Sequence, residues 1–299
     1  MGQGVSRTED KPVGRGEINA STKWCGVIGN PVEHSLSPSI HNAAFRECGL
    51  NYVYLAFRVE QIADAVRGIR ALGNAGGFSV TIPHKVSVMP YLDKIETTAR
   101  HIGAVNTIVV RDGTLTGYNT DASGAMRALR EAGVELNGQH VMVLGSGGAA
   151  RAISFGLAGG TGIARLTLLG IDDTERRTLA GELRDNTAVL IWDGRLDERT
   201  LREVLPSVGV MIHCTPVGMS PKIEESCVPS ALLSPALTVM DIVYNPRETR
   251  LLKEAKAVGA KTVPGLEMFL NQAVEQFEVW TGLPAPTAVM RNVLEAKFS

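Results

Sequence analysis

Short apolar runs alternate with amphipathic stretches along most of the chain. Three early runs of apolar and β-branched residues predict buried strands at 24–29, 52–57 and 77–82. The segment between the last two contains apolar residues at helical spacing: Val59, Ile62, Val66, Ile69 and Leu72. A strand, a helix and a strand in this order predict a β-α-β unit. Repeated alternation of this kind favours a parallel sheet covered by helices.

The alternation continues in two parts. Strands predicted at 107–110 and 115–118 flank Arg111-Asp112-Gly113, a turn sequence whose glycine accepts a positive φ, so we expect a hairpin there. A connecting helix is predicted over 122–132. After it, further strands are predicted at 141–144, 165–169, 188–192, 210–214 and 239–243. This repeated order leaves few topologies other than a doubly wound sheet of the Rossmann type.

The length of the chain favours two domains, because 299 residues exceed what one ordinary core usually serves. Residues 1–21, rich in Gly, Lys, Arg and Glu, are expected to form a flexible tail. The predicted fold class is α/β, with an N-terminal α/β domain over 22–121 and a Rossmann-like, dinucleotide-binding domain over 122–265. The helices predicted within 266–299 are expected to pack back on the first domain.

Charge and cysteine content exclude several classes of protein. Lys and Arg number 30 against 31 Asp and Glu, so the chain lacks the concentrated basic face that nucleic acid or an anionic membrane selects. No apolar run approaches the ~20 residues of a membrane span. The four cysteines form no Cys-x-x-Cys pair, and no His or Cys lies at metal-finger spacing. We expect a soluble, cytoplasmic protein without a metal site.

A glycine-rich turn predicts a dinucleotide site. Gly145-Ser146-Gly147-Gly148-Ala149 follows the strand at 141–144 and opens a predicted helix. Without side chains, such a turn lets backbone N–H groups and the positive end of the helix approach a pyrophosphate. The alternative is a turn whose glycines serve close packing alone.

The next strand of this domain bears on the choice of cofactor. Asp172 follows it, where a Rossmann fold meets the adenosine ribose. A carboxylate there accepts hydrogen bonds from ribose hydroxyls and repels a 2′-phosphate, which favours NAD. Two alternatives stay open: Asp172 caps the following helix, or Arg176 and Arg177 reach a phosphate and NADP binds.

Two hydroxyls precede a predicted helix of the first domain. Pro38 suits the first helical position, and Ser37 is expected to be the N-cap. Ser35 and Ser37 beside a helix N-terminus also suit a carboxylate, so they are candidates for binding an acidic substrate.

Three further polar residues lie at the ends of predicted elements. Lys85 follows the strand at 77–82, where a lone lysine is most often solvated. Asn106 and Asp121 end segments rich in Asn, Thr and Gly and by position alone are turn residues.

Taken together, these segments resemble the shikimate dehydrogenase family from about Cys25 to Glu295. Besides the Ser-x-Ser loop, the Asn/Asp segments and the glycine turn, the similar motifs are Cys214-Thr215-Pro216-Val217-Gly218-Met219, Asp241-Ile242-Val243-Tyr244-Asn245-Pro246, and Gly265 with Gln272. The resemblance implies an oxidoreductase that reversibly reduces 3-dehydroshikimate to shikimate with a nicotinamide cofactor, a step toward aromatic amino acids. The first domain would then bind the substrate.

The resemblance also implies roles for individual residues. Lys85 and Asp121 match the family's catalytic pair. Ser35 and Ser37 would bind the substrate carboxylate. Contacts to ring hydroxyls are expected from Thr81, Asn106, Tyr244 and Gln272. The pyrophosphate is expected against Gly145, Ser146, Gly147, Gly148 and Ala149, and the nicotinamide end near Thr215, Ile242 and Gly265.

One segment departs from the family pattern. Members that use NADP typically have Asn-Arg-Thr where this chain has Gly170-Ile171-Asp172, so the arginine that faces a 2′-phosphate is missing. This loop resembles NAD-preferring quinate/shikimate relatives, whereas Ser37 resembles the shikimate-selective members. We therefore expect NADP or NAD as the cofactor.

Two alternative functions stay open. One is an NAD-dependent quinate/shikimate dehydrogenase, and the other is a non-catalytic module that senses dehydroshikimate. In each case we expect a small-molecule ligand and a monomer or homodimer, without nucleic acid or membrane partners.

Overall fold

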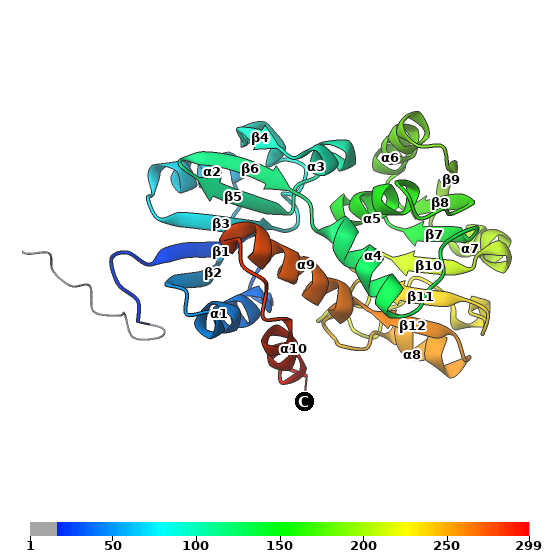
Figure 1. Cartoon of the computed structure of the whole chain (residues 1–299). Coiled ribbons are helices and arrows are strands. Elements are labelled where there is room, and N and C mark those ends of the chain that lie inside the picture. Colours follow the sequence, from blue (N-terminus) through cyan, green and yellow to red (C-terminus); the bar gives the residue numbers. More distant parts are fainter. Residues whose placement is uncertain (1–16, 299) are drawn as a thin grey trace, which may run out of the picture.

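Two six-stranded sheets lie side by side in the molecule (Figure 1). The structure, a computed structural model, describes residues 17–298. Most of the expected tail, up to residue 16, lies outside this range. The last residues before the first strand are held against the domain, because Asn51 Nδ2 donates to Asn19 Oδ1 and to Ser21 Oγ, both at 3.1 Å.

The first sheet has the strand order β2-β1-β3-β5-β6-β4. Its strands are β1 (Lys23–Gly29), β2 (Tyr52–Arg58), β3 (Ala75–Val80), β4 (Lys94–Ile95), β5 (Thr107–Arg111) and β6 (Thr114–Tyr118). β5 runs antiparallel to both β3 and β6, so the expectation of a parallel sheet is wrong here. The predicted hairpin gives the physical reason: Asp112 (φ 50°) and Gly113 (φ 74°) form a two-residue turn that reverses the chain.

Helices cover both faces of this sheet. Its helices are α1 (Ser37–Glu47), α2 (Ile62–Ala71), α3 (Thr97–Ile102), α9 (Gly265–Thr281) and α10 (Thr287–Glu295), with a short 3₁₀ turn, η1 (Met89–Tyr91). α1, α9 and α10 share one core with Val27 of β1, whereas α2 and α3 share the other core with Ile28. Adjacent strand residues point to opposite faces, so β1 serves both cores.

The second sheet is parallel throughout, in the order β12-β11-β10-β7-β8-β9. Its strands are β7 (His140–Leu144), β8 (Arg165–Gly170), β9 (Leu190–Arg195), β10 (Val210–His213), β11 (Thr238–Asp241) and β12 (Lys261–Pro264). The strand order reverses between β7 and β10, as in a doubly wound fold, where ligands bind in the crevice at this point. The predicted α/β fold class with a Rossmann-like sheet is confirmed.

Helices also cover the second sheet on both faces. They are α4 (Asp121–Glu131), α5 (Gly148–Ala158), α6 (Asp173–Asn186), α7 (Glu198–Val204) and α8 (Arg250–Ala257), with 3₁₀ turns η2 (Leu205–Ser207) and η3 (Ser230–Leu232). α4, α5 and α6 share a core with Val141 and Val143 of β7, and α7 and α8 share the opposite core with Met142 and Leu144.

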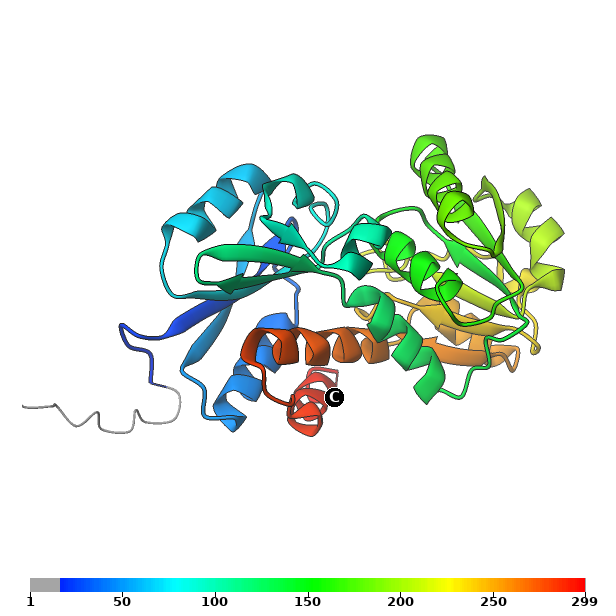
Figure 2. The ribbon, with the colours of Figure 1, turned by 45° about the horizontal axis from the view of Figure 1, so that its top comes forward.

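Two helices join the halves of the molecule. α4 leaves the first sheet after β6 and packs against α5 of the second, and α9 leaves β12 and runs back under the first sheet (Figure 2). The two helices are in close contact, because a Cβ at Gly124 of α4 would lie 2.9 Å from the backbone nitrogen of Gln272 on α9. This packing fixes the strand ends of the two sheets relative to each other.

Candidate active site

The strand directions of the first sheet bring four polar segments to one edge. The carboxyl ends of β1, β3 and β6 lie at this edge, and the antiparallel β5 begins there. The chain segments that leave or enter the sheet at this edge contain Ser35, Ser37, Thr81, Lys85, Asn106 and Asp121. Ser35 and Asp121, which are 86 positions apart in the sequence, thus belong to one region of the surface.

Lys85 and Asp121 form an ion pair at this edge. Lys85 Nζ donates to Asp121 Oδ2 at 2.5 Å, and the two side chains are only 14% and 7% exposed. Asp121 is the first residue of α4, where the helix dipole stabilises a carboxylate. The backbone N–H of Asp121 also donates to Asn119 Oδ1 at 3.0 Å. The lysine is therefore not the solvated residue that its position in the sequence suggests most often.

Asn106 holds the other oxygen of Asp121. Its Nδ2 donates to Asp121 Oδ1 at 2.9 Å and to Thr120 Oγ1 at 3.0 Å, and its Oδ1 accepts from the backbone N–H of Thr120 at 2.8 Å. These bonds fix the orientation of the amide. Asp121 thus has one oxygen fixed by Asn106 and the other available to Lys85.

A buried chain of hydrogen bonds supports Asn106 from behind. Tyr54 donates to Ser79 Oγ at 2.6 Å, Ser79 donates to Gln276 Oε1 at 2.8 Å, and Gln276 Nε2 donates to Thr107 Oγ1 at 2.9 Å. Thr107 in turn donates to Asn106 Oδ1 at 2.8 Å. Sequence reasoning did not identify Gln276. Its signal is a polar residue within the apolar stripe of α9, next to Phe277.

The serine loop enters α1 differently from the prediction. α1 begins at Ser37 and its N-cap is Leu36, so the expectation that Ser37 is the N-cap is wrong. The reason is local: Ser35 Oγ accepts from the backbone N–H of Ser37 at 3.3 Å, and the Leu36 carbonyl accepts from Ser39 N at 3.1 Å. Both serines lie at the helix N-terminus. Within residues 17–298, no hydrogen bond joins either serine to the Lys85–Asp121 pair.

The glycine turn lies at the carboxyl edge of the second sheet. Gly145 follows β7 with φ +118°, a backbone conformation that side chains rarely adopt. Gly147 is the N-cap of α5 and supplies no side-chain cap, and a Cβ there would meet no protein atom within 4 Å. The first amides of α5 are therefore open to a ligand. Their arrangement fits a pyrophosphate.

The third glycine of the turn, Gly148, faces the first sheet. A Cβ at Gly148 would lie 3.1 Å from Lys85 Cβ and 3.3 Å from Lys85 Cδ. The stem of Lys85 therefore lies directly against the start of α5. This contact brings the ion pair of one half of the molecule next to the glycine turn of the other.

The crevice at the strand reversal contains the other residues expected near the nicotinamide. A Cβ at Gly145 would lie 3.4 Å from Thr215 Cγ2, so the loops after β7 and β10 touch. Cys214 is next to Thr215; burial raises the pKa of its thiol well above the ordinary value, and the charges of Asp241, Asp121 and Lys85 also act on it. These loops and the ion pair thus surround one region.

Gly265 and Ile242 are in contact at the ends of β11 and β12. A Cβ at Gly265 would lie 2.5 Å from the carbonyl carbon and oxygen of Ile242, so only glycine fits there. Tyr244, two residues after Ile242, packs against Phe269 of α9 with ring centroids 4.4 Å apart and ring planes tilted by 32°, and burial raises the pKa of Tyr244 to about 12. Gln272 lies one turn further along α9 and donates to the Phe269 carbonyl at 2.9 Å.

Thr81, which follows β3, is an expected substrate contact that takes part in none of the hydrogen bonds described above. Its backbone N–H donates to the Ile28 carbonyl at 3.0 Å, and its methyl group would meet a Cβ placed on Gly29. The side chain is half-buried, and within residues 17–298 its hydroxyl donates no hydrogen bond.

The acidic segment after β8 adopts the capping arrangement. Asp172 Oδ1 accepts from the backbone N–H of Glu175 at 2.9 Å and so caps α6. Glu175 reaches back to the glycine turn, where its Oε2 accepts from Ser146 Oγ at 3.3 Å. Arg176 is only 5% exposed and is bound to Asp173 and Asp193, so its guanidinium is not free for a phosphate. Arg177 is exposed.

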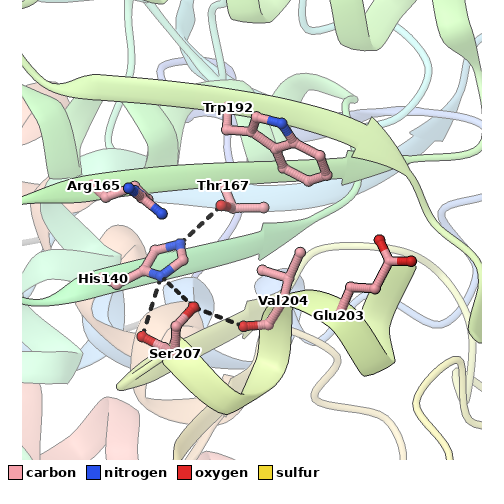
Figure 3. Close-up of a pocket in the computed structure, with 7 residues that line it drawn as sticks. All are labelled: His140, Arg165, Thr167, Trp192, Glu203, Val204 and Ser207. Atoms are coloured by element: carbon pink, nitrogen blue, oxygen red, sulfur yellow. Dashed lines mark hydrogen bonds between the residues drawn. The ribbon is translucent and has the colours of Figure 1, made fainter. Parts of the chain in front are cut away.

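A small pocket of about 180 Å³ lies elsewhere, on the face of the second sheet near α7 (Figure 3). Three of its polar residues already bond to one another: His140 Nε2 contacts Thr167 Oγ1 at 2.8 Å, and His140 Nδ1 contacts the Ser207 hydroxyl at 3.1 Å. Since β7 and β8 begin at His140 and Arg165, this pocket is at the opposite end of the strands from the glycine turn.

Residues 17–298 contain neither a metal-binding cluster nor a membrane-spanning helix. No cluster of three His, Cys, Asp or Glu side chains is able to hold a metal ion there. Of the helices in this range, none combines the length and apolar character that a membrane crossing needs. The four cysteines are unpaired.

Comparison with known families identifies the first domain and the C-terminal helices. The family described as the shikimate dehydrogenase substrate binding domain matches residues 27–108, and the shikimate 5′-dehydrogenase C-terminal domain matches residues 265–295. A curated relative from Desulforamulus reducens, a shikimate dehydrogenase (NADP(+)), is 43% identical over 96% of this chain and 99% of its own.

Two solved structures are also similar over nearly the whole chain. Shikimate 5-dehydrogenase from Listeria monocytogenes, in complex with shikimate and NAD, is 38% identical with a TM-score of 0.84, covering 93% of this chain and 98% of that one. Quinate dehydrogenase from Corynebacterium glutamicum, in complex with NAD, is 28% identical with a TM-score of 0.84, covering 92% and 99%. The chain belongs to the shikimate dehydrogenase family.

Proposed function

We propose that this protein is a shikimate dehydrogenase that interconverts 3-dehydroshikimate and shikimate with a nicotinamide dinucleotide. The observation that supports this most strongly is the Lys85–Asp121 pair, bonded at 2.5 Å and in contact with the glycine turn at Gly148. Reduction of a carbonyl by a dinucleotide requires a proton donor beside the bound cofactor, and Lys85 lies against the turn proposed to bind that cofactor's pyrophosphate. A module that only senses dehydroshikimate would need no such donor.

The proposed substrate contacts follow the edge of the first sheet. Ser35 and Ser37, at the N-terminus of α1, bind the carboxylate through their hydroxyls and the favourable helix dipole. Thr81, Asn106, Tyr244 and Gln272 contact the ring hydroxyls. Asn106 has a second task, because its Nδ2 also holds Asp121.

The cofactor contacts follow the edge of the second sheet. The open amides of α5 and the glycine turn bind the pyrophosphate, with Ser146 and Ala149 at its sides. Thr215, Ile242 and Gly265 line the nicotinamide end of the crevice, where the loops after β7 and β10 touch. The bound cofactor supplies the hydride and accepts it in the reverse direction.

Lys85 moves the proton in the proposed mechanism. As charge develops on the C3 oxygen during reduction, Lys85 Nζ donates a proton to that oxygen and stabilises it electrostatically. Asp121 keeps Nζ in place, and Asn106 and the α4 N-terminus keep Asp121 in place. During oxidation, the same amine accepts the proton of the hydroxyl.

We propose NAD as the preferred cofactor, although the relative from Desulforamulus reducens is named for NADP(+). The carboxylate of Asp172 follows β8, where the ribose is expected, and that of Glu175 lies against Ser146 of the neighbouring glycine turn. Like charges at ~4 Å repel by up to ~4 kcal/mol at an effective dielectric near 20, and less when solvent screens them. Arg176 does not compensate, because its guanidinium is already bound to two aspartates.

Quinate is a candidate second substrate. The acidic segment favours NAD, and the similar quinate dehydrogenase from Corynebacterium glutamicum was solved with NAD. An extra C1 hydroxyl on the substrate is a weak basis for rejection unless a polar group is left unpaired. We propose shikimate as the better substrate because Ser37 follows the shikimate-selective pattern. A monomer or homodimer in the cytoplasm completes the proposal; all four cysteines are free, as a reducing compartment requires.

One assay tests the proposed function. Absorbance at the reduced-nicotinamide band is followed with shikimate or quinate, each offered with NAD and with NADP. The proposal expects the highest kcat/KM with shikimate and NAD. Higher kcat/KM with quinate would support the quinate reading, and no turnover in any of the four combinations would contradict the proposed activity.

A further inference from the structure

A buried histidine and a buried aspartate contact each other beneath the crevice. His213 and Asp241 end the adjacent parallel strands β10 and β11, where they lie opposite each other. Their side chains are 1% and 0% exposed, and His213 Nδ1 lies 2.8 Å from Asp241 Oδ1. Neither residue takes part in the proton transfer proposed for Lys85. Polar groups this deeply buried require a complete set of partners.

The hydrogen bonds of Asp241 define which atoms are donors. Oδ1 also accepts from the backbone N–H of Val243 at 3.0 Å, and Oδ2 accepts from the Thr249 hydroxyl at 2.6 Å. Because Oδ1 already accepts from a backbone N–H and Oδ2 from a hydroxyl, the carboxyl faces His213 as an acceptor. His213 Nδ1 must then hold a hydrogen.

The other ring nitrogen contacts Thr215. His213 Nε2 bonds to Thr215 Oγ1, and the same oxygen accepts from the backbone N–H of Val217 at 3.2 Å. If Nε2 holds a hydrogen, both lone pairs of Thr215 Oγ1 are occupied. The hydroxyl proton of Thr215 must then point away from His213 and Val217. If Nε2 is bare, Thr215 donates to it and offers the crevice no proton.

The charges around the ring favour the form with two hydrogens. Burial lowers the pKa of His213, but the hydrogen bonds and charges of Asp241 and Cys227 outweigh it and raise the pKa to about 10. These two are the titratable groups that act on the ring. Together with the oxygens that face both ring nitrogens, Asp241 Oδ1 and Thr215 Oγ1, this raised pKa favours the imidazolium.

We propose that His213 is a positioning residue: it donates to Asp241 and to Thr215, and so directs the Thr215 hydroxyl proton toward the cofactor crevice. The inference rests on the proposed function, since Thr215 lies at the expected nicotinamide end against Gly145. The acceptor that suits this donor is a carbonyl oxygen, such as that of a carboxamide on the nicotinamide ring. Asp241 acts through His213, and neither residue touches the reacting atoms.

Two substitutions separate the two bonds of His213. His213→Asn retains a donor near Asp241 but does not reach Thr215, whereas His213→Gln reaches Thr215 and lacks the donor near Asp241. We expect His213→Asn to raise the Kd for NAD, measured by fluorescence titration, about tenfold, as for a lost hydrogen bond to a charged group. His213→Gln is expected to retain most of the affinity.

A double-mutant cycle distinguishes positioning from a general structural role. Thr215→Val removes the hydroxyl at nearly constant volume. If His213 acts through Thr215, the double variant His213→Asn/Thr215→Val binds NAD no more weakly than Thr215→Val alone. Losses that multiply would overturn the proposal, because they would mean that the two residues act independently.

The protonation state is tested without any turnover. In the unsubstituted protein labelled with ¹⁵N-histidine, the His213 ring is assigned by its disappearance in His213→Gln. We expect both ring nitrogens to be protonated at pH 7, with or without NAD. A bare Nε2 would overturn the inference, even if a substituted protein failed to fold. Because the spectrum does not depend on catalysis, this result is separate from failure of the four-way assay, which would refute the proposed function.

Discussion

The contact between Lys85 and Gly148 gives a direct test of how the two halves of the site meet. Gly148 is the first residue of α5, with a helical backbone that alanine accepts. Gly148→Ala adds one methyl group, and that group points at the stem of Lys85 and not into solvent. Alanine is the better helix former, so the free energy of unfolding is not expected to fall.

The expected size of the effect follows from the geometry. The new Cβ would lie 3.1 Å from Lys85 Cβ, about 0.3 Å short of the 3.4 Å at which ordinary contact begins. Lys85 must move by a few tenths of an ångström. A displacement of ~1 Å at a reacting group costs ~10²-fold in rate, so we expect kcat to fall about three- to tenfold.

Gly147→Ala is the matched control, since a Cβ there meets no protein atom within 4 Å and points into the space expected for the pyrophosphate. It should raise the Kd for NAD more than Gly148→Ala does, and lower kcat less. Steady-state rates give kcat, and fluorescence titration gives the Kd. If Gly148→Ala changed neither kcat nor the Kd, Lys85 would not lie against the turn, and our reasoning about the junction would be refuted.

Three further predictions concern other parts of the structure. Asp172→Ala should raise the KM for NAD more than the KM for NADP, because it removes the proposed contact to the ribose. Asp172→Ser can still cap α6 and should have the same effect on the two KM values. Equal changes in KM for both cofactors would reject a ribose contact. Gln276→Leu leaves buried partners in Ser79 and Thr107 unpaired, so urea unfolding should show a loss of about 2–4 kcal/mol, whereas a loss under about 1 kcal/mol would contradict the buried chain. Burial lowers the pKa of the His41 imidazole to about 3, so between pH 6.5 and 5 only the unfolded chain binds a proton at His41. Over this pH range the free energy of unfolding should therefore fall by about 2 kcal/mol more in the parent than in His41→Phe. Equal falls in the two proteins would contradict the burial of a neutral His41.

The alternation of apolar runs and helical stripes was enough to predict the fold class and most strands. The errors lie at the sheet edges. β9 was expected at 188–192 and lies at Leu190–Arg195, and β12 (Lys261–Pro264) was not expected at all. Both strands have a neighbour on one side only, so fewer of their residues are buried and the apolar signal is weak.

The candidate site could be predicted only where family motifs supplied the residues. Position alone favoured a solvated Lys85, because nothing in the local sequence shows that α4 places Asp121 against it. Gln276 and His213 were missed for the same reason. Their partners, Ser79, Thr107 and Asp241, come from other strands, and a linear pattern does not record such contacts.

The central claim is that Lys85 transfers the proton at the junction of the two halves. The most direct test is kcat for shikimate oxidation by Lys85→Ala, measured together with the Kd for NAD. We predict a loss of at least ~10²-fold in kcat with little change in the Kd, as for removal of a general acid-base group. A Lys85→Ala protein that turns over within about tenfold of the parent would contradict the account.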